Sequence, residues 1–456
     1  MRAERIIVEP FTFAHIEELK IVKEINQHAQ AVVRGILDKD TDEELLKAIP
    51  ANVVVTIKAE STNQEVIIFK GIIGKISLKI ENGLRILRLW SYSHTYLLDK
   101  KKQTRIFQNT KSSFSEMIKY IGSINHARAI YTEGKGKSTG RFIIQYGETD
   151  WEFLKRIASM IHTVIVADNI NGKVSYCLGI PKLKKEDMKN IDIQTMEIWE
   201  PCSISEGRER DYVKDGTLIF GVETREVLEL CTPLDFQGKE CIISRVECRI
   251  EGKELLNAYE LVEIRNIRTA EKLHKEISGV SLEGVVHRVV QDQIQISFGQ
   301  DTTEPEVWFP YATVYSSPDG AGWYCMPEKG DAVRVYFPDC DERKGIAISS
   351  IHLACDLREN PDVKYIRSPY DKEIRFDSSA IRITNNQGMS VILDDKEGIL
   401  LESNGNIIFS AGGDIEIQSG RELNIIGCEG ISICQGDNEI EIKDGIRQTA
   451  NKIWQR

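Results

Sequence analysis

The chain has 456 residues, 41% hydrophobic and 28% charged, which is enough apolar content for folded cores in about two to four domains. Its net charge is −11, and residues 373–445 contribute −9 of it, with 14 acidic against 5 basic side chains. This balance argues against nucleic-acid binding, which needs a basic surface. Residues 1–10 lack an apolar signal-peptide core, so we expect cytoplasmic folding and any export by another route.

The first hundred residues show the alternating pattern of β-strands. Residues 53–57, 65–69 and 84–90 are the clearest runs, and Asn82-Gly83 between the last two is a typical hairpin turn. Two helices are expected further along, over residues 113–122 and 149–161, each beginning after a capping Ser or Thr and carrying an apolar stripe. Residues 163–280 return to short strands, so we expect a mainly β fold with few helices.

Three clusters of polar residues allow a functional and a structural interpretation. Asp150-Trp151-Glu152 has the residue types of a catalytic carboxylate pair, but acids in the first turn of a helix are favoured by its dipole, and we favour that explanation. Glu24 and His28 have no metal-site context, and we expect a surface pair. The segment 134–138 (GKGKS) lacks phosphate-loop spacing, and we expect a flexible loop.

Ten cysteines are scattered without C-x-x-C spacing, so zinc and redox use are not expected, and we predict reduced, mostly buried thiols. Cys428 and Cys434 lie in successive repeats described below, where small-residue packing and inter-chain chemistry are both open. No cofactor or metal is predicted.

Residues 281–355 contain five strand-like runs in about 70 residues, which is the size of an oligonucleotide/oligosaccharide-binding (OB) barrel. Four aromatic residues could stack on bases or sugars there, but nearby acids weaken any basic groove, and we favour packing in a trimeric collar. The four are Trp308, Tyr311, Trp323 and Tyr324. Residues 356–372 are expected to be a linker.

The segment 373–445 contains a repeat of eight residues, in which apolar residues at i and i+2 alternate with glycine-rich turns. Such a period is typical of a β-solenoid, but an eight-residue coil is too short to enclose a core by itself. We therefore predict a needle of three chains wound around one axis. The expected trimer core is Ile399, Leu401, Ile407, Phe409, Ile415, Ile417, Leu423, Ile425, Ile431 and Ile433.

The end of the chain breaks the repeat, since the next apolar pair follows after nine residues and residues 446–456 form an irregular tail. An end that exposes apolar side chains needs a cover. A second protein bound at this tip and a tail that folds over itself both remain open. The predicted contacts for a tip protein are Ile440, Ile442, Ile446, Ile453 and Trp454.

Two motifs, together with the order of the segments, support a resemblance. Residues 97–109 combine a Leu-Asp with a Phe-Gln before the first helix, and residues 146–154 (YGETDWEFL) open the second helix. The chain resembles VgrG, the spike of type VI secretion and related contractile injection systems, and equally the hub and spike proteins of contractile phage tails. The resemblance implies a hub over residues 1–280 built from two small barrels, an OB collar and a needle.

That resemblance also implies a non-enzymatic role. The spike would cap an inner tube of hexameric rings within a baseplate and would puncture a target envelope when a sheath contracts. All eight histidines precede the needle, so the metal-binding apex of some phage needles is missing, which implies a separate PAAR-type tip protein and separately secreted effectors. Residues 356–372 leave no room for a lysozyme, and residues 446–456 none for a fused effector.

Three alternatives remain at this point. The chain could belong to a phage or tailocin baseplate rather than a secretion system. It could be a cell-wall lytic tail enzyme, although the short linker argues against one. It could also be a monomeric β-solenoid adhesin with a sugar-binding barrel, which predicts a monomer where the spike predicts a trimer.

Overall fold

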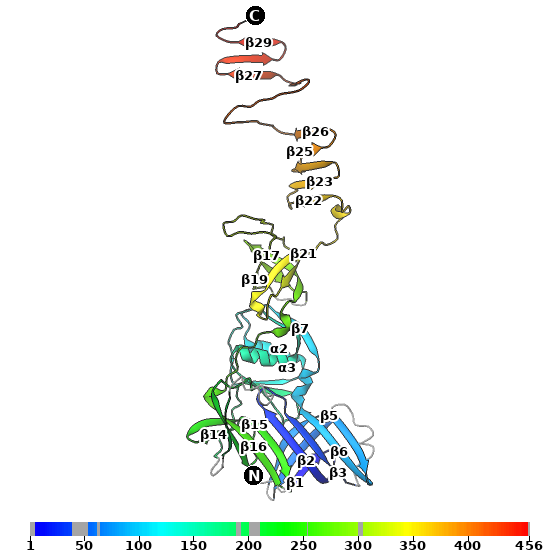
Figure 1. Ribbon diagram of the computed structural model, residues 1–456, viewed down its shortest axis with the longest axis vertical. Coiled ribbons are helices and arrows are strands. Elements are labelled where there is room, and N and C mark those ends of the chain that lie inside the picture. Colours follow the sequence, from blue (N-terminus) through cyan, green and yellow to red (C-terminus); the bar gives the residue numbers. More distant parts are fainter. Residues whose placement is uncertain are drawn as a thin grey trace. The chain divides into compact units, whose positions relative to one another are not determined.

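The computed structural model describes residues 5–38, 53–61, 64–187, 193–199, 210–252, 254–299 and 304–454. The chain divides into two compact units, Met1–Leu353 and Ala354–Arg456 (Figure 1). Among the described residues, no helix is long and apolar enough to cross a bilayer. Strands dominate both units, which confirms the predicted mainly β fold.

A large sheet forms the base of the first unit, in the order β1-β4-β5-β6-β3-β2-β15-β16-β13-β12, with β14 beside β15 (Figure 1). The predicted hairpin turn is present, since Asn82 and Gly83 both have positive φ, as this turn type requires. The strands of one half are β1 (Arg5–Glu9), β2 (Phe13–Glu24), β3 (Gln30–Leu37), β4 (Val54–Ser61), β5 (Gln64–Glu81) and β6 (Leu84–Ser93). Those of the other half are β12 (Ile193–Trp199), β13 (Thr217–Thr224), β14 (Pro233–Phe236), β15 (Lys239–Glu251) and β16 (Glu254–Glu263).

The two halves of this sheet are joined edge to edge, because β2 pairs antiparallel with β15 from Glu24↔Arg245 to Lys20↔Arg249. A single buried core runs across both halves. These strands form one continuous sheet, and the expected hub of two small barrels stays a prediction.

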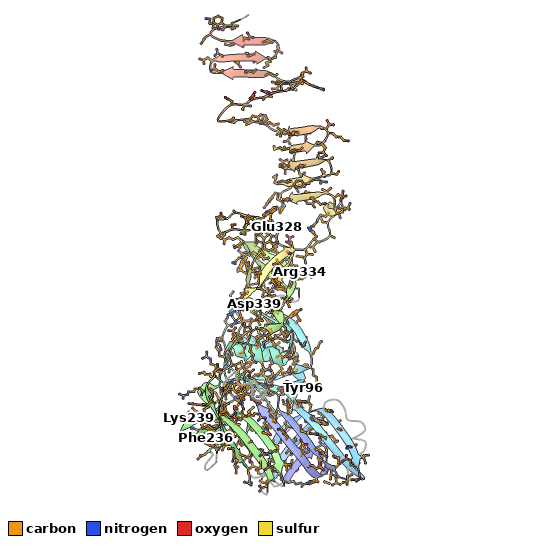
Figure 2. The ribbon with its side chains drawn as sticks, viewed as in Figure 1. Tyr96, Phe236, Lys239, Glu328, Arg334 and Asp339 are labelled. Atoms are coloured by element: carbon orange, nitrogen blue, oxygen red, sulfur yellow. The ribbon has the colours of Figure 1, made fainter. Side chains whose placement is uncertain are left out.

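A smaller layer with both main helices follows the first half of the sheet. It contains η1 (His94–Asp99), β7 (Lys102–Phe107), α2 (Phe114–Ile124), β8 (Arg128–Tyr131), β9 (Ile143–Thr149), α3 (Asp150–Met160), β10 (Ile165–Ala167) and β11 (Ser175–Leu178). Strands β7 and β9 pair with each other, and β10, β11 and β8 form a sheet of three. Tyr96 of η1, labelled in Figure 2, stacks on Tyr92 at 4.5 Å.

Both predicted helices are confirmed, and each begins with a capping box. The Ser113 side chain accepts from the backbone N–H of Glu116 at 3.2 Å, and the Glu116 carboxylate accepts from the Ser113 N–H at 2.7 Å. Thr149 and Glu152 make the same reciprocal pair at 3.1 and 2.8 Å. The Thr149 hydroxyl also donates to Asp99.

We predict that Thr149→Ala lowers the free energy of unfolding by about 1–2 kcal/mol and Ser113→Ala by about 1 kcal/mol or less. Each variant loses a cap and a second side-chain bond, but the buried Thr149 bonds the Asp99 carboxylate, whereas the half-buried Ser113 bonds the Ser115 hydroxyl at 2.9 Å. Urea denaturation followed by circular dichroism measures both. Equal losses in the two variants would contradict this order.

The remaining strands of the first unit form a five-stranded sheet in the order β19-β18-β17-β20-β21. A parallel bridge between Tyr311 and Ala347 joins its two ends, which closes the sheet. Its strands are β17 (Ser281–Val290), β18 (Gln293–Ser297), β19 (Trp308–Pro310), β20 (Ala332–Tyr336) and β21 (Ile346–Ser350). The short 3₁₀ turns η4 (Lys275–Ile277) and η5 (Glu342–Lys344) flank strands of this sheet in sequence, whereas η3 (Ile264–Asn266) follows β16 and contacts β15 of the large sheet. The strand count agrees with the expected barrel, and its assignment as an OB fold stays a prediction.

The core of this closed sheet extends beyond the predicted boundary at residue 280. Phe142, in the loop before β9, packs against Phe309 at 5.5 Å, Phe298 at 5.8 Å and Phe337 at 6.0 Å. Ile144 of β9 and Ile277 of η4 belong to the same buried cluster. The expected hub and collar therefore share a core within one compact unit.

The second unit begins with η6 (Asp356–Arg358) and contains two antiparallel meanders (Figure 1). The first has β22 (Lys364–Arg367), β23 (Glu373–Phe376), β24 (Ala380–Thr384), β25 (Met389–Asp394) and β26 (Gly398–Ser403). The second has β27 (Ile431–Gln435), β28 (Asn438–Ile442) and β29 (Ile446–Thr449). The described segment 404–430 contains no strand.

One expectation for this unit is corrected. The predicted linker 356–372 contains β22, which pairs with β23 from Lys364↔Phe376 to Arg367↔Glu373, so the sheet starts before residue 373. Within the single chain, β23 to β26 pair antiparallel, each with the next. The predicted coil of three chains stays a prediction.

Candidate functional site

One face of the first meander is lined by aliphatic side chains. Since side chains alternate between faces of a strand, the paired residues identify two cross-strand rows. The first row is Ile366, Ile374, Ile383, Val391 and Leu401. The second is Phe376, Ile381, Leu393 and Ile399. Both rows lie on the same face, which we call the aliphatic face.

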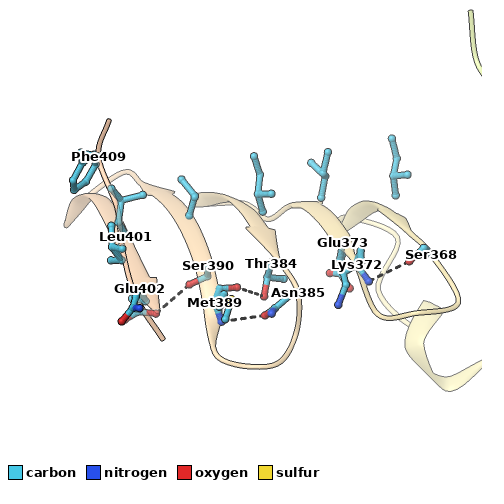
Figure 3. Close-up of a pocket in the computed structure, with 16 residues that line it drawn as sticks. Ser368, Lys372, Glu373, Thr384, Asn385, Met389, Ser390, Leu401, Glu402 and Phe409 are labelled. Carbon is cyan, nitrogen blue, oxygen red and sulfur yellow. Dashed lines mark hydrogen bonds between the residues drawn. The ribbon is translucent and has the colours of Figure 1, made fainter. Parts of the chain in front are cut away.

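This face is open in the single chain. A groove of about 730 Å³ runs along it, lined by the first row together with Met389, Ile407 and Phe409 (Figure 3). Ile399 is 73% exposed, and its neighbours in both rows are exposed or half-buried. A continuous apolar face of this size is a surface that folded proteins normally cover.

The predicted core residues between the two meanders are also exposed. Ile407, Phe409, Ile415, Ile417, Leu423 and Ile425 all lie in the described segment without strands. Apolar residues recur there at i and i+2 between glycine-containing turns, as in short strands, yet no strand forms within 404–430. The segment is exposed in the single chain, so water can satisfy its backbone groups while its apolar pairs stay uncovered.

The second meander repeats the pattern at the end of the chain. Ile431, Ile442 and Ile446 form one cross-strand row, and Ile433 and Ile440 pair in the next. Three predicted tip contacts, Ile440, Ile442 and Ile446, thus share a face with the predicted core pair of this sheet. The other two, Ile453 and Trp454, follow the last strand; Trp454 is 79% exposed, with the Lys452 ammonium 3.9 Å from its ring centre.

The opposite face of the first meander is polar at its start. Arg375 and Arg382 are a cross-strand pair, and Asp377 binds both guanidinium groups, at 2.9 and 3.0 Å. The hydrogen bond from Arg375 is the main reason that the pKa of Asp377 lies below its usual value. Like charges directly opposite would otherwise repel, so Asp377 explains why two arginines tolerate this register.

A second notable cluster lies in the first unit, and sequence inspection did not find it. Arg156 of α3 is 3% exposed and donates two bonds to Glu148, both at 2.8 Å, and two to Glu342 of η5, at 3.1 and 3.2 Å. It also donates to the Ile144 carbonyl at 2.5 Å. The His274 ring accepts from the Tyr146 N–H at 3.2 Å. This buried cluster connects the helical layer to the closed sheet.

The cluster holds two carboxylates, one permanent cation and a histidine, and burial is the largest cause of the pKa shift of each carboxylate and of the histidine. Burial raises the pKa of Glu342 to about 7, although Arg156 opposes the shift. Burial also raises the pKa of Glu148, again against Arg156. Burial and the nearby Arg156 charge lower the pKa of His274 to about 3, which keeps its ring neutral. We therefore interpret this cluster of Arg156, Glu148, Glu342 and His274 as structural and call it the buried joint.

The other polar clusters have structural partners. Asp150 accepts from Arg105, from Asn125 at 2.7 Å and from Gln145 at 3.0 Å, and Trp151 packs on His28, so the helix-start interpretation is confirmed. The expected surface pair of Glu24 and His28 is wrong. Glu24 accepts from Tyr212 at 3.0 Å, whereas His28 contacts Thr95 and Asp99, because each side chain points into a different polar network.

The remaining expectations have mixed outcomes. Residues 134–138 form a loop between two strands, β8 and β9, and no helix follows as a phosphate loop requires. Of the nine described cysteines, only four are buried, so the expectation of mostly buried thiols is wrong. Cys428 and Cys434 are exposed. Trp308 and Tyr311 are half-buried, whereas Trp323 and Tyr324 are exposed, and their packing in a collar stays a prediction.

No protein-family model and no curated protein sequence matches this chain. Solved structures do match. The E. coli c3393 protein, a type VI secretion component described as similar to T4 tail proteins gp27 and gp5, aligns with a TM-score of 0.52 at 12% identity over 76% of this chain and 100% of its own. The chain has the fold of the VgrG-type spike.

Two further VgrG-type matches agree. A chain of the half-lidded Francisella PdpA–VgrG complex aligns with a TM-score of 0.56 at 12% identity over 85% of this chain and 83% of its own. The lidded complex gives 0.54 at 11% identity over 85% and 76%. The VgrG-type fold thus spans both units, as the sequence resemblance implied, and the similarity extends to phage-tail proteins through c3393.

Proposed function

We propose that the chain is a homotrimeric, non-enzymatic spike of a contractile injection machine. Support comes from the fold and from the aliphatic face together. The fold is shared with type VI secretion spikes, and the aliphatic face and the segment 404–430 remain open in one chain. Three chains that turn these faces inward would cover both and supply the missing strand partners.

The open aliphatic face carries this proposal. Burying apolar surface contributes roughly 25 cal/mol per Å². Each of the two meanders carries aliphatic rows of its own. A threefold bundle would also give every strand a neighbour, so no lateral edge would stay open. A shaft held in this way is stiff, and stiffness is what force transmission needs.

The wider role follows the same proposal. The hub sheet would mate with hexameric inner-tube rings within a baseplate, and a PAAR-type tip protein would cover the exposed end near Trp454. Sheath contraction would drive the spike through the target envelope, with effectors carried as separate proteins. The particle would be assembled in the cytoplasm and delivered outside it. A phage or tailocin baseplate would use the same design.

Multi-angle light scattering of the purified chain tests the trimer. We expect a mass about three times 51.8 kDa, and a mass of one chain for Ile415→Asp/Ile417→Asp, because charges inside an apolar axis are uncompensated. The matched control Glu416→Lys changes charge at the residue between them and should stay trimeric. A monomeric wild-type chain would refute the spike and favour the solenoid adhesin.

A further inference from the structure

The polar face of the first meander changes character along the chain. The cross-strand row opposite the aliphatic face is Tyr365, Arg375, Arg382, Ile392 and Leu400. After Tyr365, it therefore continues with two paired arginines and ends with two aliphatic residues. Both aliphatic residues are half-buried by their neighbours in the single chain.

The aliphatic character continues into the next repeat. Ile408 lies between Ile407 and Phe409, as Leu400 lies between Ile399 and Leu401, and it is 81% exposed. The corresponding residues in the three following repeats are Glu416, Asn424 and Ser432. Ile392 and Leu400 are a cross-strand pair, and Ile408 is the equivalent residue of the next repeat in sequence; we call the three the outer aliphatic stripe.

Carboxylates border the stripe on both sides. Glu402 lies two residues beyond Leu400, at the edge of the sheet where it also lines the groove in Figure 3, and accepts from Ser390 at 3.2 Å. Asp394 lies two residues beyond Ile392, and because the strands are antiparallel, it borders the other side. Arg382, the nearest cation in the row, is already paired with Asp377 at 3.0 Å. The border of the stripe is therefore negative.

We propose that the outer aliphatic stripe is a docking surface for a partner protein that presents aliphatic side chains flanked by lysine or arginine. This inference rests on the proposed trimer, in which the opposite face turns inward and the stripe faces out. Charge complementarity favours such a partner. A second copy of this face would bring carboxylates against carboxylates, and an anionic lipid surface would be repelled.

The test measures binding of a fluorescein-labelled amphipathic leucine–lysine peptide to the full chain by fluorescence anisotropy at physiological salt. Leu400→Ser should weaken binding about tenfold and Glu402→Lys at least about fivefold, because one removes the apolar contact and the other reverses its border. Glu416→Lys makes the same charge change beyond the stripe and should alter affinity less than about twofold.

Three results would overturn the docking surface. These are unchanged affinity in Leu400→Ser, equal losses in Glu402→Lys and Glu416→Lys, and Leu400-dependent sedimentation with phosphatidylcholine vesicles, which would assign the stripe to lipid. Light scattering of Leu400→Ser and Leu401→Ser separates this failure from that of the trimer. Of these two variants, only Leu401→Ser should dissociate the trimer. Dissociation by Leu400→Ser would place Leu400 inside the trimer and refute the stripe alone. A monomeric wild-type chain would refute the trimer.

Discussion

Replacing Arg156 with methionine is expected to lower the free energy of unfolding of the chain by about 3–5 kcal/mol at neutral pH. The guanidinium makes four bonds to Glu148 and Glu342 and one to the Ile144 carbonyl, and no more than 8% of any of the three charged residues is exposed. Without it, the two buried carboxylates lose the cation that hydrogen-bonds to both of them and must take up protons or draw in water.

Arg343→Met is the matched control, because Arg343 adjoins Glu342 and forms a bidentate pair with Asp341 at 2.7 Å but is half exposed. Its loss should lower stability by about 1 kcal/mol or less. The triple variant Arg156→Met/Glu148→Gln/Glu342→Gln should recover much of the deficit, because the buried charges are then gone. Urea denaturation at one fixed protein concentration measures all four proteins. Equal losses in the two single variants would show that Arg156 is not the centre of the joint.

Much of the fold was predictable because its signals are local. Ser113 and Glu116, or Thr149 and Glu152, form capping boxes within three residues of sequence. The Asn82-Gly83 turn and the repeat of eight residues likewise depend on neighbours in the chain. Such patterns select a structure through backbone geometry that every chain shares, so they could be recognised before any coordinates were known.

The buried joint could not be found in this way. Arg156 meets Glu148 across 8 residues of sequence but Glu342 across 186, and no periodic pattern marks either pairing. The contact between β2 and β15, which joins the two halves of the large sheet, is also distant in sequence. The repeat of eight residues predicts what three chains would build together, so the pairing of strands within one chain does not test that prediction.

The second large effect is a pH dependence of stability that originates at Glu342. Burial raises its pKa in the folded chain to about 7, against 4.5 for an ordinary glutamate. The folded state therefore binds more protons between these values. Protonated Glu342 therefore contributes to the free energy of unfolding. This contribution is fully present below about pH 4.5 and is lost as the pH rises to about 7, and it amounts to a difference on the order of 3 kcal/mol.

His274, in the same cluster, changes stability with pH in the opposite direction. The pKa of His274 is lowered from 6.5 to about 3, so the unfolded chain binds more protons in that window and stability rises with pH there. Glu148, whose pKa is raised by burial, adds to the Glu342 trend, and Arg141 and Glu276 also act on the two carboxylates. The wild-type profile alone therefore mixes opposing contributions, and a difference between variants is needed to isolate Glu342.

Glu342→Gln isolates that contribution, since glutamine keeps the shape and does not titrate. Between pH 5 and pH 8, we expect the free energy of unfolding of the wild type to fall by about 2–3 kcal/mol relative to that of Glu342→Gln. Urea denaturation in steps of half a pH unit measures both. Asp339→Asn is the control, because that exposed carboxylate pairs with Lys344 at 2.6 Å and its pKa is already lowered, so it stays ionised throughout. A constant difference for Glu342→Gln across this range would contradict the raised pKa and would mean that Glu342 is already ionised in the folded chain at pH 5.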